Sequence, residues 1–425
     1  MAQSARKPRV TVGANAADRA RNLATGAGLV DDPYPKYAEL RETGPVHEGS
    51  ISGVFDMEGP ESQGWRDRRN FSLYDWKTVD AMLRDNETYS SSWYEASLGA
   101  VVGFSILQMD EPEHRRYRSL VQPAFTRLNI EDWRKRWIQP AVDAIVDGFV
   151  ERGEPVDIYA ELCAKVPVYT IASSFGVAAE DVPHFHELAV TSVGVIGDPA
   201  GRIRASNEIA DYLRGIIADR RHSGTGDLIS VLCTVEIDDP DSGESHHLSD
   251  DEILAFARIM LPAGAGTTYR GLGCLFLGLL ETGQIDQLRE DRSLIDAAIE
   301  ESLRWEQPLT SISRLSTRDS ELGGVKIPAG SVVHGCVAAA NRDPARWDDP
   351  DTFDIRRPLQ PHASFGSGPH LCIGMHLART EMRCAINAVL DRMPGLRLDP
   401  DADKPWITGL LFRTPTAVPV VFDAP

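Results

Sequence analysis

The segment Phe365–Gly374 constrains the fold of this chain more than any other part of the sequence. It reads Phe-Gly-Ser-Gly-Pro-His-Leu-Cys-Ile-Gly and places a single cysteine, Cys372, just before a predicted helix over about 373–392. Its three glycines let the backbone approach a flat ligand closely. The helix dipole and the free N–H groups of the first helical turn favour a thiolate over a thiol, and hydrogen bonds to the sulfur would temper its electron donation. The pattern therefore predicts a loop that presents an anionic sulfur ligand.

Two other interpretations of this segment compete with a metal-bound thiolate. A lone cysteine is most often a buried structural residue. A zinc site built from His370, Cys372 and His376 is the second alternative, but zinc ligands usually come as pairs at turn spacing, and no second pair appears in the sequence. Within the ten-residue pattern we expect Cys372 to bind a haem iron.

The segment resembles the signature of the cytochrome P450 superfamily. The matching residues are Phe365, Gly366, Gly368, His370, Cys372 and Gly374. The resemblance continues in order from His114 to the final helix. It implies a mainly α fold with a minor β portion, in which haem b lies between a long oxygen-binding helix and the helix after the cysteine loop. It also implies a bacterial-type monooxygenase that uses O2 and haem iron.

Glu301 and Arg304 are three residues apart and therefore share one helix face. Such a pair is usually a solvated surface bridge. Their position 71 residues before Cys372 is similar to that of the family's ExxR element. The resemblance implies that Arg357 is the third member and that the three residues hold the cysteine loop.

Haem carries two propionates, which need cationic partners when they are buried. His114 and Arg118, four residues apart, lie on one helix face. They are similar to the family's propionate-binding HxxxR, and Arg314 and His370 match its other two contacts. Taken singly, each is more typical of a surface cation or a core histidine.

A helical pattern runs from a capping box at Ser249 and Glu252 to Thr282, where Gly283 is expected to end it. Its middle contains Pro262, which removes a helical donor and costs ~3 kcal/mol in a helix interior. Two alternatives stay open from this pattern alone. The chain forms either two helices with a break, or one buried helix that opens against a ligand.

The segment Ala263–Thr268 is similar to the family's oxygen-binding motif. The resemblance implies that Ala263 contacts haem, that Gly264 makes room for haem and dioxygen, and that the hydroxyls of Thr267 and Thr268 serve proton delivery. The chain departs from the family where Gly266 replaces the usual acid. The departure leaves the route of the protons open, and it keeps a peroxide-driven peroxygenase as an alternative.

The remaining organisation is simple. The 425 residues contain no linker or repeat, so we expect one domain over 21–425 and a disordered tail over 1–20. Glycine- and proline-punctuated segments near 45–75 and 310–340 predict short strands and hairpins. The net charge of −19, from 44 basic and 63 acidic residues, disfavours nucleic-acid binding. Six scattered cysteines, no apolar leader and no membrane span predict a cytoplasmic protein.

Substrate and electron donor are inferred by family position. The expected substrate-facing residues are Val102, Phe104, Ile259, Leu309, Ile312, Leu410 and Leu411. They predict an apolar substrate such as a terpenoid, steroid or aromatic compound. Because the chain ends about 50 residues after Cys372, we expect a separate ferredoxin and an NAD(P)H-dependent ferredoxin reductase. Arg115, Arg116 and Arg379 are candidate docking cations, and a non-catalytic haem sensor is a further alternative.

Overall fold

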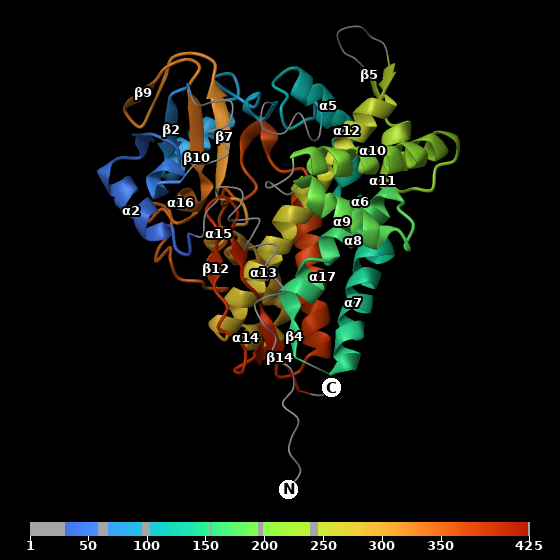
Figure 1. Cartoon of the computed structure of the whole chain (residues 1–425). Coiled ribbons are helices and arrows are strands. Elements are labelled where there is room, and N and C mark those ends of the chain that lie inside the picture. The colour runs from blue at the N-terminus through green and yellow to red at the C-terminus, as the bar shows by residue number, and fades with distance from the viewer. Residues whose placement is uncertain are drawn as a thin grey trace.

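A computed structural model describes residues 30–57, 67–95, 103–153, 155–193, 199–238 and 245–423. The predicted tail over 1–20 and Val102 lie outside these ranges. The molecule has a large helical part and a smaller part built around a sheet, and the two meet at helices α13 (Gly266–Glu281) and α15 (Ile295–Trp305) (Figure 1). The predicted fold class, mainly α with a minor β portion, is confirmed.

The other α-helices are α2 Tyr34–Thr43, α3 Trp76–Arg84, α5 Glu113–Val121, α6 Arg127–Trp133, α7 Gln139–Arg152, α8 Val166–Phe175, α9 Val182–Val193, α10 Pro199–His222, α11 Leu228–Thr234, α12 Asp250–Met260, α14 Ile285–Glu290, α16 Val337–Asn341 and α17 Met375–Arg392. Short 3-10 and π segments are η2 Gly53–Phe55, η4 Gln122–Phe125, η5 Arg134–Ile138, η6 Tyr159–Cys163, η7 Leu261–Ala265, η8 Arg292–Leu294 and η9 Gly368–His370. The strands are β1 Val46–Glu48, β2 Asn70–Leu73, β3 Tyr89–Ser90, β4 Val156–Asp157, β5 Glu236–Asp238, β6 Ser245–His247, β7 Ser311–Ser316, β8 Ser320–Leu322, β9 Val325–Ile327, β10 Val332–Cys336, β11 Arg397–Leu398, β12 Ile407–Thr408, β13 Thr414–Pro415 and β14 Pro419–Val421. None of the helices in the described ranges is both long and apolar enough to cross a bilayer.

The main sheet has five strands in the order β1-β2-β10-β7-β3. The hairpins predicted between 310 and 340 are present, and β8 pairs antiparallel with β9. The turn between them uses Gly323 and Gly324 at φ +55° and +81°, values that suit glycine and match the twist of a two-residue hairpin. Strand β10 is buried along its whole length and pairs with β7, which carries Arg314.

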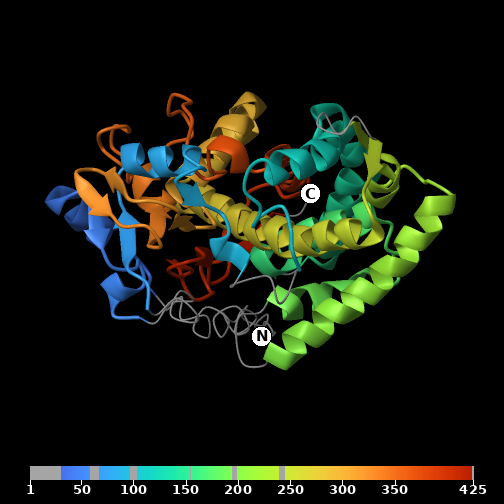
Figure 2. The same cartoon turned by 90° about the horizontal axis from the view of Figure 1, so that it is seen from above.

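The long helical pattern forms one run of helix with a widened turn in its middle. The capping box at Ser249 and Glu252 is present, helix α12 passes into the π segment η7, and α13 follows without a break. Pro262 has no N–H, and a π turn accommodates the lost hydrogen bond without ending the helix. Figure 2 shows this run crossing the middle of the molecule. Of the two alternatives, the single opened helix is therefore correct.

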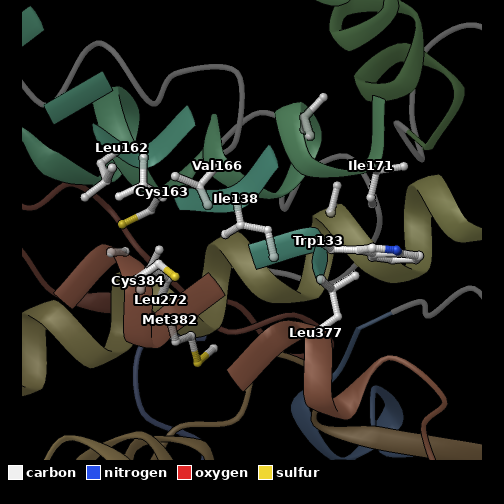
Figure 3. Packing of buried hydrophobic residues seen from close by; sticks show 14 of the residues in the cluster. Trp133, Ile138, Leu162, Cys163, Val166, Ile171, Leu272, Leu377, Met382 and Cys384 are labelled. Atoms are coloured by element: carbon white, nitrogen blue, oxygen red, sulfur yellow. The ribbon is translucent and has the colours of Figure 1, made fainter. Parts of the chain in front are cut away.

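The largest hydrophobic core packs α13 and α17 against the helices of the middle of the chain. Leu272 of α13, Met382 and Cys384 of α17, and Cys163 of η6 lie close together in it (Figure 3). Leu272 has no exposed surface. Truncation of such a side chain to alanine costs ~2–5 kcal/mol. This packing fixes the positions of two helices. Helix α13 begins within the segment Ala263–Thr268, and helix α17 follows the cysteine loop.

A buried carboxylate joins the first described residues to the end of the chain. Glu306 accepts hydrogen bonds from Tyr34 Oη at 2.7 Å and from Arg413 Nε at 2.6 Å. Arg413 also donates to the carbonyl oxygens of Val30 and Asp31, both at 2.8 Å. The ion pair of Glu306 and Arg413 therefore connects residues 30–34 to the turn between β12 and β13.

Candidate active site

The loop before α17 is closed by its own backbone. The N–H of Cys372 donates to the carbonyl of Phe365 at 2.9 Å. Gly366 and Gly368 have φ values of +71° and +73°, in the left-handed region that favours glycine. A Cβ on Gly368 would lie 2.5 Å from the carbonyl oxygen of Leu83 in α3, so only glycine fits there. The sequence pattern thus specifies this loop geometry.

Cys372 is half-buried at the entry to α17. Burial is the largest influence on its thiol and raises its pKa. The N–H groups of Gly374 and Met375 and the charges of Arg118 and Arg379 act in the opposite direction and favour the thiolate. A metal cation at the sulfur would add to these influences, since coordination deprotonates a thiol. Burial outweighs these groups in the free protein, so the sulfur becomes anionic when it binds a metal cation.

Beside the loop, residues from three separate segments form a polar cluster of two arginines and two histidines, namely His114, Arg118, Arg314 and His370. The rings of His114 and His370 are stacked, with centroids 4.0 Å apart and an angle of 34° between the planes. His114 Nδ1 lies 3.3 Å from Glu111 Oε1, and His370 Nε2 lies 3.0 Å from Ser91 Oγ. The sequence predicted these four residues as a set, and the structure brings them together.

The cluster holds more positive charge than its surroundings balance. Among the residues that the structure describes, neither Arg118 nor Arg314 forms an ion pair with a carboxylate. Burial, followed by the charges of Arg314, His114 and Arg118, lowers the pKa of His370 to about 2. The buried Nε2 of His114 has no hydrogen-bond partner in the described part of the chain. A ligand with two carboxylates, as in haem, fits this donor set.

The predicted trio of Glu301, Arg304 and Arg357 is assembled. Arg304 donates to both carboxylate oxygens of Glu301 at 2.8 Å, and Arg357 Nε donates to Oε1 at 3.1 Å. Both Glu301 and Arg304 are buried. The remaining guanidinium nitrogens donate to backbone carbonyls between residues 341 and 352. A buried ion pair with all donors satisfied in this way fixes the path of that segment.

Asn341 connects the trio of Glu301, Arg304 and Arg357 to the start of the cysteine loop. The amide of Asn341 donates to Ser364 Oγ at 2.8 Å and accepts from the N–H of Ala363 at 2.8 Å. Ser364 Oγ donates to the carbonyl of Leu303 at 2.6 Å, one residue before Arg304. Hydrogen bonds therefore connect the trio to the residues directly before Phe365.

In the oxygen motif, Thr267 Oγ1 donates to the carbonyl of Ala263 at 2.8 Å. Ala263 is exposed and Thr267 half-buried, although they lie in the central helix, while Thr268 is buried. The absent Cβ of Gly264 points at α8, where it would lie 2.8 Å from Ile171 Cδ1. Gly264 therefore makes room for Ile171, and its predicted role toward haem and dioxygen stays a prediction.

Gly266, which replaces the usual acid, faces an arginine. Arg270 Nη1 donates to the carbonyl of Gly266 at 2.8 Å and would lie 3.3 Å from a Cβ at this position. The guanidinium also lies 4.8 Å from the centroid of the Phe412 ring. Sequence reasoning did not single out Arg270, because an arginine one turn after a glycine carries no distinctive pattern.

The predicted substrate-facing residues differ in their surroundings. Leu309, Ile312 and Leu411 are half-buried, Ile259 is buried, and Phe104 is 51% exposed. Leu410 is only 3% exposed and belongs to a core cluster with Tyr37 and Ala338, and its contact with substrate stays a prediction. Leu410 and Leu411 lie in the turn between β12 and β13, where Leu410 packs into the core and Leu411 is half-buried.

The three proposed docking cations are also unequal. Arg115 has 81% of its side chain exposed and Arg116 is exposed, as a docking surface needs. Arg379 does not fit, because its guanidinium is bound through two nitrogens to Glu300 at 2.6 and 2.7 Å.

For the zinc alternative, the described residues contain no group of three or more His, Cys, Asp or Glu side chains that could hold a metal ion.

Sequence reasoning missed a buried acid on α17. Glu381 is 2% exposed, and its Oε1 has no hydrogen-bond partner within the described ranges. Burial raises its pKa to about 8, opposed by a hydrogen bond with Thr170. A single glutamate within a helix gives no sequence signal of burial.

Known proteins share the fold of this chain. A family model described as Cytochrome P450 matches residues 199–406. The cytochrome P450 monooxygenase PikC of Streptomyces venezuelae is 34% identical over 93% of this chain and 92% of its own length. The structure of cytochrome P450 CYP109Q5 from Chondromyces apiculatus superimposes with a TM-score of 0.80 at 30% identity, covering 93% of this chain and 97% of that one. CYP109E1 from Bacillus megaterium in complex with corticosterone gives a TM-score of 0.79 at 27% identity, with coverage of 92% and 98%. The chain thus belongs to the cytochrome P450 family of monooxygenases, which use haem iron and O2.

Proposed function

We propose that the chain is a haem-thiolate monooxygenase whose iron ligand is Cys372 and whose substrate is an apolar small molecule. The observation that carries this proposal is the polar cluster of His114, Arg118, Arg314 and His370 beside a half-buried cysteine at a helix entry. Haem offers a metal for the sulfur and two carboxylates for the cluster. When bound, it supplies the redox chemistry that places one oxygen atom in the product and the other in water.

The chain supplies binding and orientation. The N–H groups of Gly374 and Met375 stabilise negative charge on the sulfur of Cys372. The guanidinium groups of Arg118 and Arg314 neutralise the propionates. The trio of Glu301, Arg304 and Arg357 keeps the loop in position through Asn341 and Ser364.

Thr267 is the residue that we assign to proton handling. Its hydroxyl already donates to the carbonyl of Ala263, so it holds a defined orientation before any ligand arrives. Because position 266 carries no acid, protons reach Thr267 through water rather than from a neighbouring carboxylate. A positioned hydroxyl of this kind contributes to the delivery of protons to dioxygen.

An apolar substrate is supported by the half-buried side chains of Leu309, Ile312, Leu411 and Phe412. Phe412 is held by a β-bridge to Leu309. The likeness to CYP109E1, solved with corticosterone, supports a steroid-sized molecule. Titration with a steroid, a terpenoid and a small dicarboxylic acid tests this assignment through the shift of the haem absorption band. A response to the dicarboxylic acid alone would contradict it.

Electrons come, in this proposal, one at a time from a separate ferredoxin with its NAD(P)H-dependent reductase, in the cytoplasm. The exposed Arg115 and Arg116 are suited to an acidic partner. A peroxide-driven reaction is the second candidate, favoured by the missing acid at Gly266. Product formation with hydrogen peroxide and no reductase would support this second candidate.

The carbon monoxide difference spectrum of the dithionite-reduced protein tests the haem-thiolate assignment directly. We expect the strongly red-shifted Soret band of a thiolate complex. The Cys372→Ser variant would lose this band, whereas Cys384→Ser, in the helix that follows the loop, would keep it. Haem absorbance with an unshifted band in the unsubstituted protein would contradict Cys372 as the ligand.

A further inference from the structure

Three residues that the proposed function does not use form a compact ionic group next to the cysteine loop. Glu300 of α15 binds Arg379 of α17, with Nε–Oε1 at 2.6 Å and Nη2–Oε2 at 2.7 Å. His362 Nε2 lies 3.2 Å from Glu300 Oε2. Burial raises the pKa of Glu300, but hydrogen bonds from Arg379 and His362 outweigh it and lower the pKa to about 2. The carboxylate is therefore charged under all ordinary conditions, and its arginine contact has the strong bidentate geometry.

Two residues of this group, Arg379 and His362, contact Phe365, the first residue of the cysteine loop. The guanidinium carbon of Arg379 lies 4.5 Å from the centroid of the Phe365 ring. The ring of His362 lies 5.8 Å from the same ring at an angle of 35°. The carbonyl of Phe365 in turn accepts the hydrogen bond from the N–H of Cys372 at 2.9 Å. Glu300 thus holds two groups that contact Phe365, one hydrogen bond away from the sulfur-bearing residue.

The charges of this group oppose one another at the sulfur. The positive charge of Arg379 acts on Cys372 and favours its anionic form. The negative charge of Glu300 acts in the other direction and reduces the effect of Arg379. Both side chains are only 24% exposed, so water screens them less than it screens a surface pair.

From this arrangement we propose that Glu300, Arg379 and His362 form a proximal clamp, which positions Phe365 and sets the reduction potential of the haem bound at Cys372. The inference rests on the proposed function, since it takes Cys372 as the iron ligand. Reduction adds one electron at the metal, so a nearby cation raises the potential and a nearby anion lowers it. These are positioning residues, because none of them needs to touch the metal or the substrate.

The test is the midpoint potential of the substrate-free, haem-loaded protein, measured by spectroelectrochemistry with mediator dyes. Glu300→Gln leaves Arg379 uncompensated, and the potential is expected to rise. Arg379→Gln leaves Glu300 uncompensated, and the potential is expected to fall. Arg379→Lys keeps the positive charge, so its potential is expected to stay closer to that of the unsubstituted protein than that of Arg379→Gln.

The same two helices offer a matched control one turn away. Asp296 of α15 pairs with Arg383 of α17 at 2.7 Å, and these side chains are 64% and 41% exposed. Asp296→Asn and Arg383→Gln remove the same charges from a solvated pair, and neither is expected to move the potential. A shift in these controls as large as in the clamp variants would overturn the proposal, because the clamp would then have no special influence.

The signs of the shifts distinguish the clamp from a merely structural contact. Shifts in the same direction for Glu300→Gln and Arg379→Gln, or no shift in either, would overturn the proposal. If Glu300→Gln fails to fold, Arg379→Gln and Arg379→Lys still decide it. The carbon monoxide difference spectrum of the unsubstituted protein separates the two ideas. Without a thiolate band there, the proposed function fails, whereas a thiolate band with unmoved potentials defeats the clamp alone.

Discussion

The imidazole rings of His114 and His370 are stacked with their centroids 4.0 Å apart, although one comes from helix α5 and the other from the cysteine loop. Burial is the largest cause that lowers the pKa of each ring, so both are neutral at pH 7. Neither ring is therefore a cation at pH 7, and the positive charge of the cluster comes from Arg118 and Arg314.

His114→Phe keeps an aromatic ring in this stack but removes the buried Nε2, which can donate to a propionate when it carries the ring proton. A hydrogen bond to a charged group contributes about 1.5–3 kcal/mol. We therefore expect haem to leave the variant roughly tenfold to a hundredfold faster. Transfer of haem to an excess of apomyoglobin, followed by absorbance, measures this rate. The control His184→Phe changes a histidine that is 61% exposed, and its rate should match that of the unsubstituted protein.

Thr267→Val removes the hydroxyl that bonds the carbonyl of Ala263 and replaces it with a side chain of similar shape. General acid–base groups contribute typically about 10²–10⁴-fold. We expect the rate of product formation to fall by at least about tenfold while NAD(P)H is still consumed and peroxide accumulates. The ratio of product to NAD(P)H measures the loss.

Thr282→Val is the matched control for this change, because Thr282, at the C-cap of the same helix, donates to the carbonyl of Gly278 at 2.7 Å with the same spacing. It removes an equivalent bond far from the oxygen motif. Equal losses of product in both variants would show that the effect comes from the helix rather than from the hydroxyl of Thr267.

Arg357→Met removes one of the two ion pairs of Glu301, whose side chain is only 4% exposed. Removing a partner from a buried ion pair costs about 3–5 kcal/mol, and Arg304 remains as the second partner of Glu301, so we expect the low end of that range. Denaturant unfolding of the haem-loaded protein measures the loss. Arg356→Met, at the exposed neighbour that donates to Gln287, should change the free energy of unfolding by less than ~1 kcal/mol.

Glu381→Gln tests the buried acid of α17. The pKa of Glu381 is raised to about 8, mainly by burial, above the ~4.3 of an unfolded glutamate. Between these values the folded protein keeps a proton that the unfolded chain releases, so stability falls as the pH rises through this window. The glutamine variant lacks this loss and should be more stable by about 3 kcal/mol at pH 7. Thermal unfolding of both proteins from pH 5 to 9 measures the difference, and parallel curves would show that Glu381 does not titrate in this range.

The sequence predicted features whose causes are local. The capping box at Ser249, the hairpin glycines and the tight cysteine loop each follow from the conformational preferences of a few neighbouring residues. The residues of the cysteine loop, the trio and the polar cluster were predicted as sets, because the resemblance to the family fixes their order along the chain. These features account for the fold class and for most of the candidate site.

Features that depend on tertiary packing were not accessible in this way. The partner of Arg379 is 79 positions away in the chain, and no local pattern selects Glu300 over the solvent. Leu410 and Leu411 are chemically identical, and only the packing of the turn decides which faces the core. The π segment at Leu261–Ala265 lets the helix continue past Pro262, whereas the sequence alone allowed either a break or one continuous helix there.

The ion pair of Glu306 and Arg413 has a consequence for exchanging parts between related enzymes. The guanidinium of Arg413 reaches the carbonyls of Val30 and Asp31, and the N–H of Gly409 donates to the carbonyl of Val30 at 3.1 Å. The turn that carries Leu411 and Phe412 is therefore shaped by backbone almost 400 positions earlier. A chimaera that takes this turn from one parent should also take the segment around Val30 from the same parent, because the two are bonded to each other although they are far apart in the sequence.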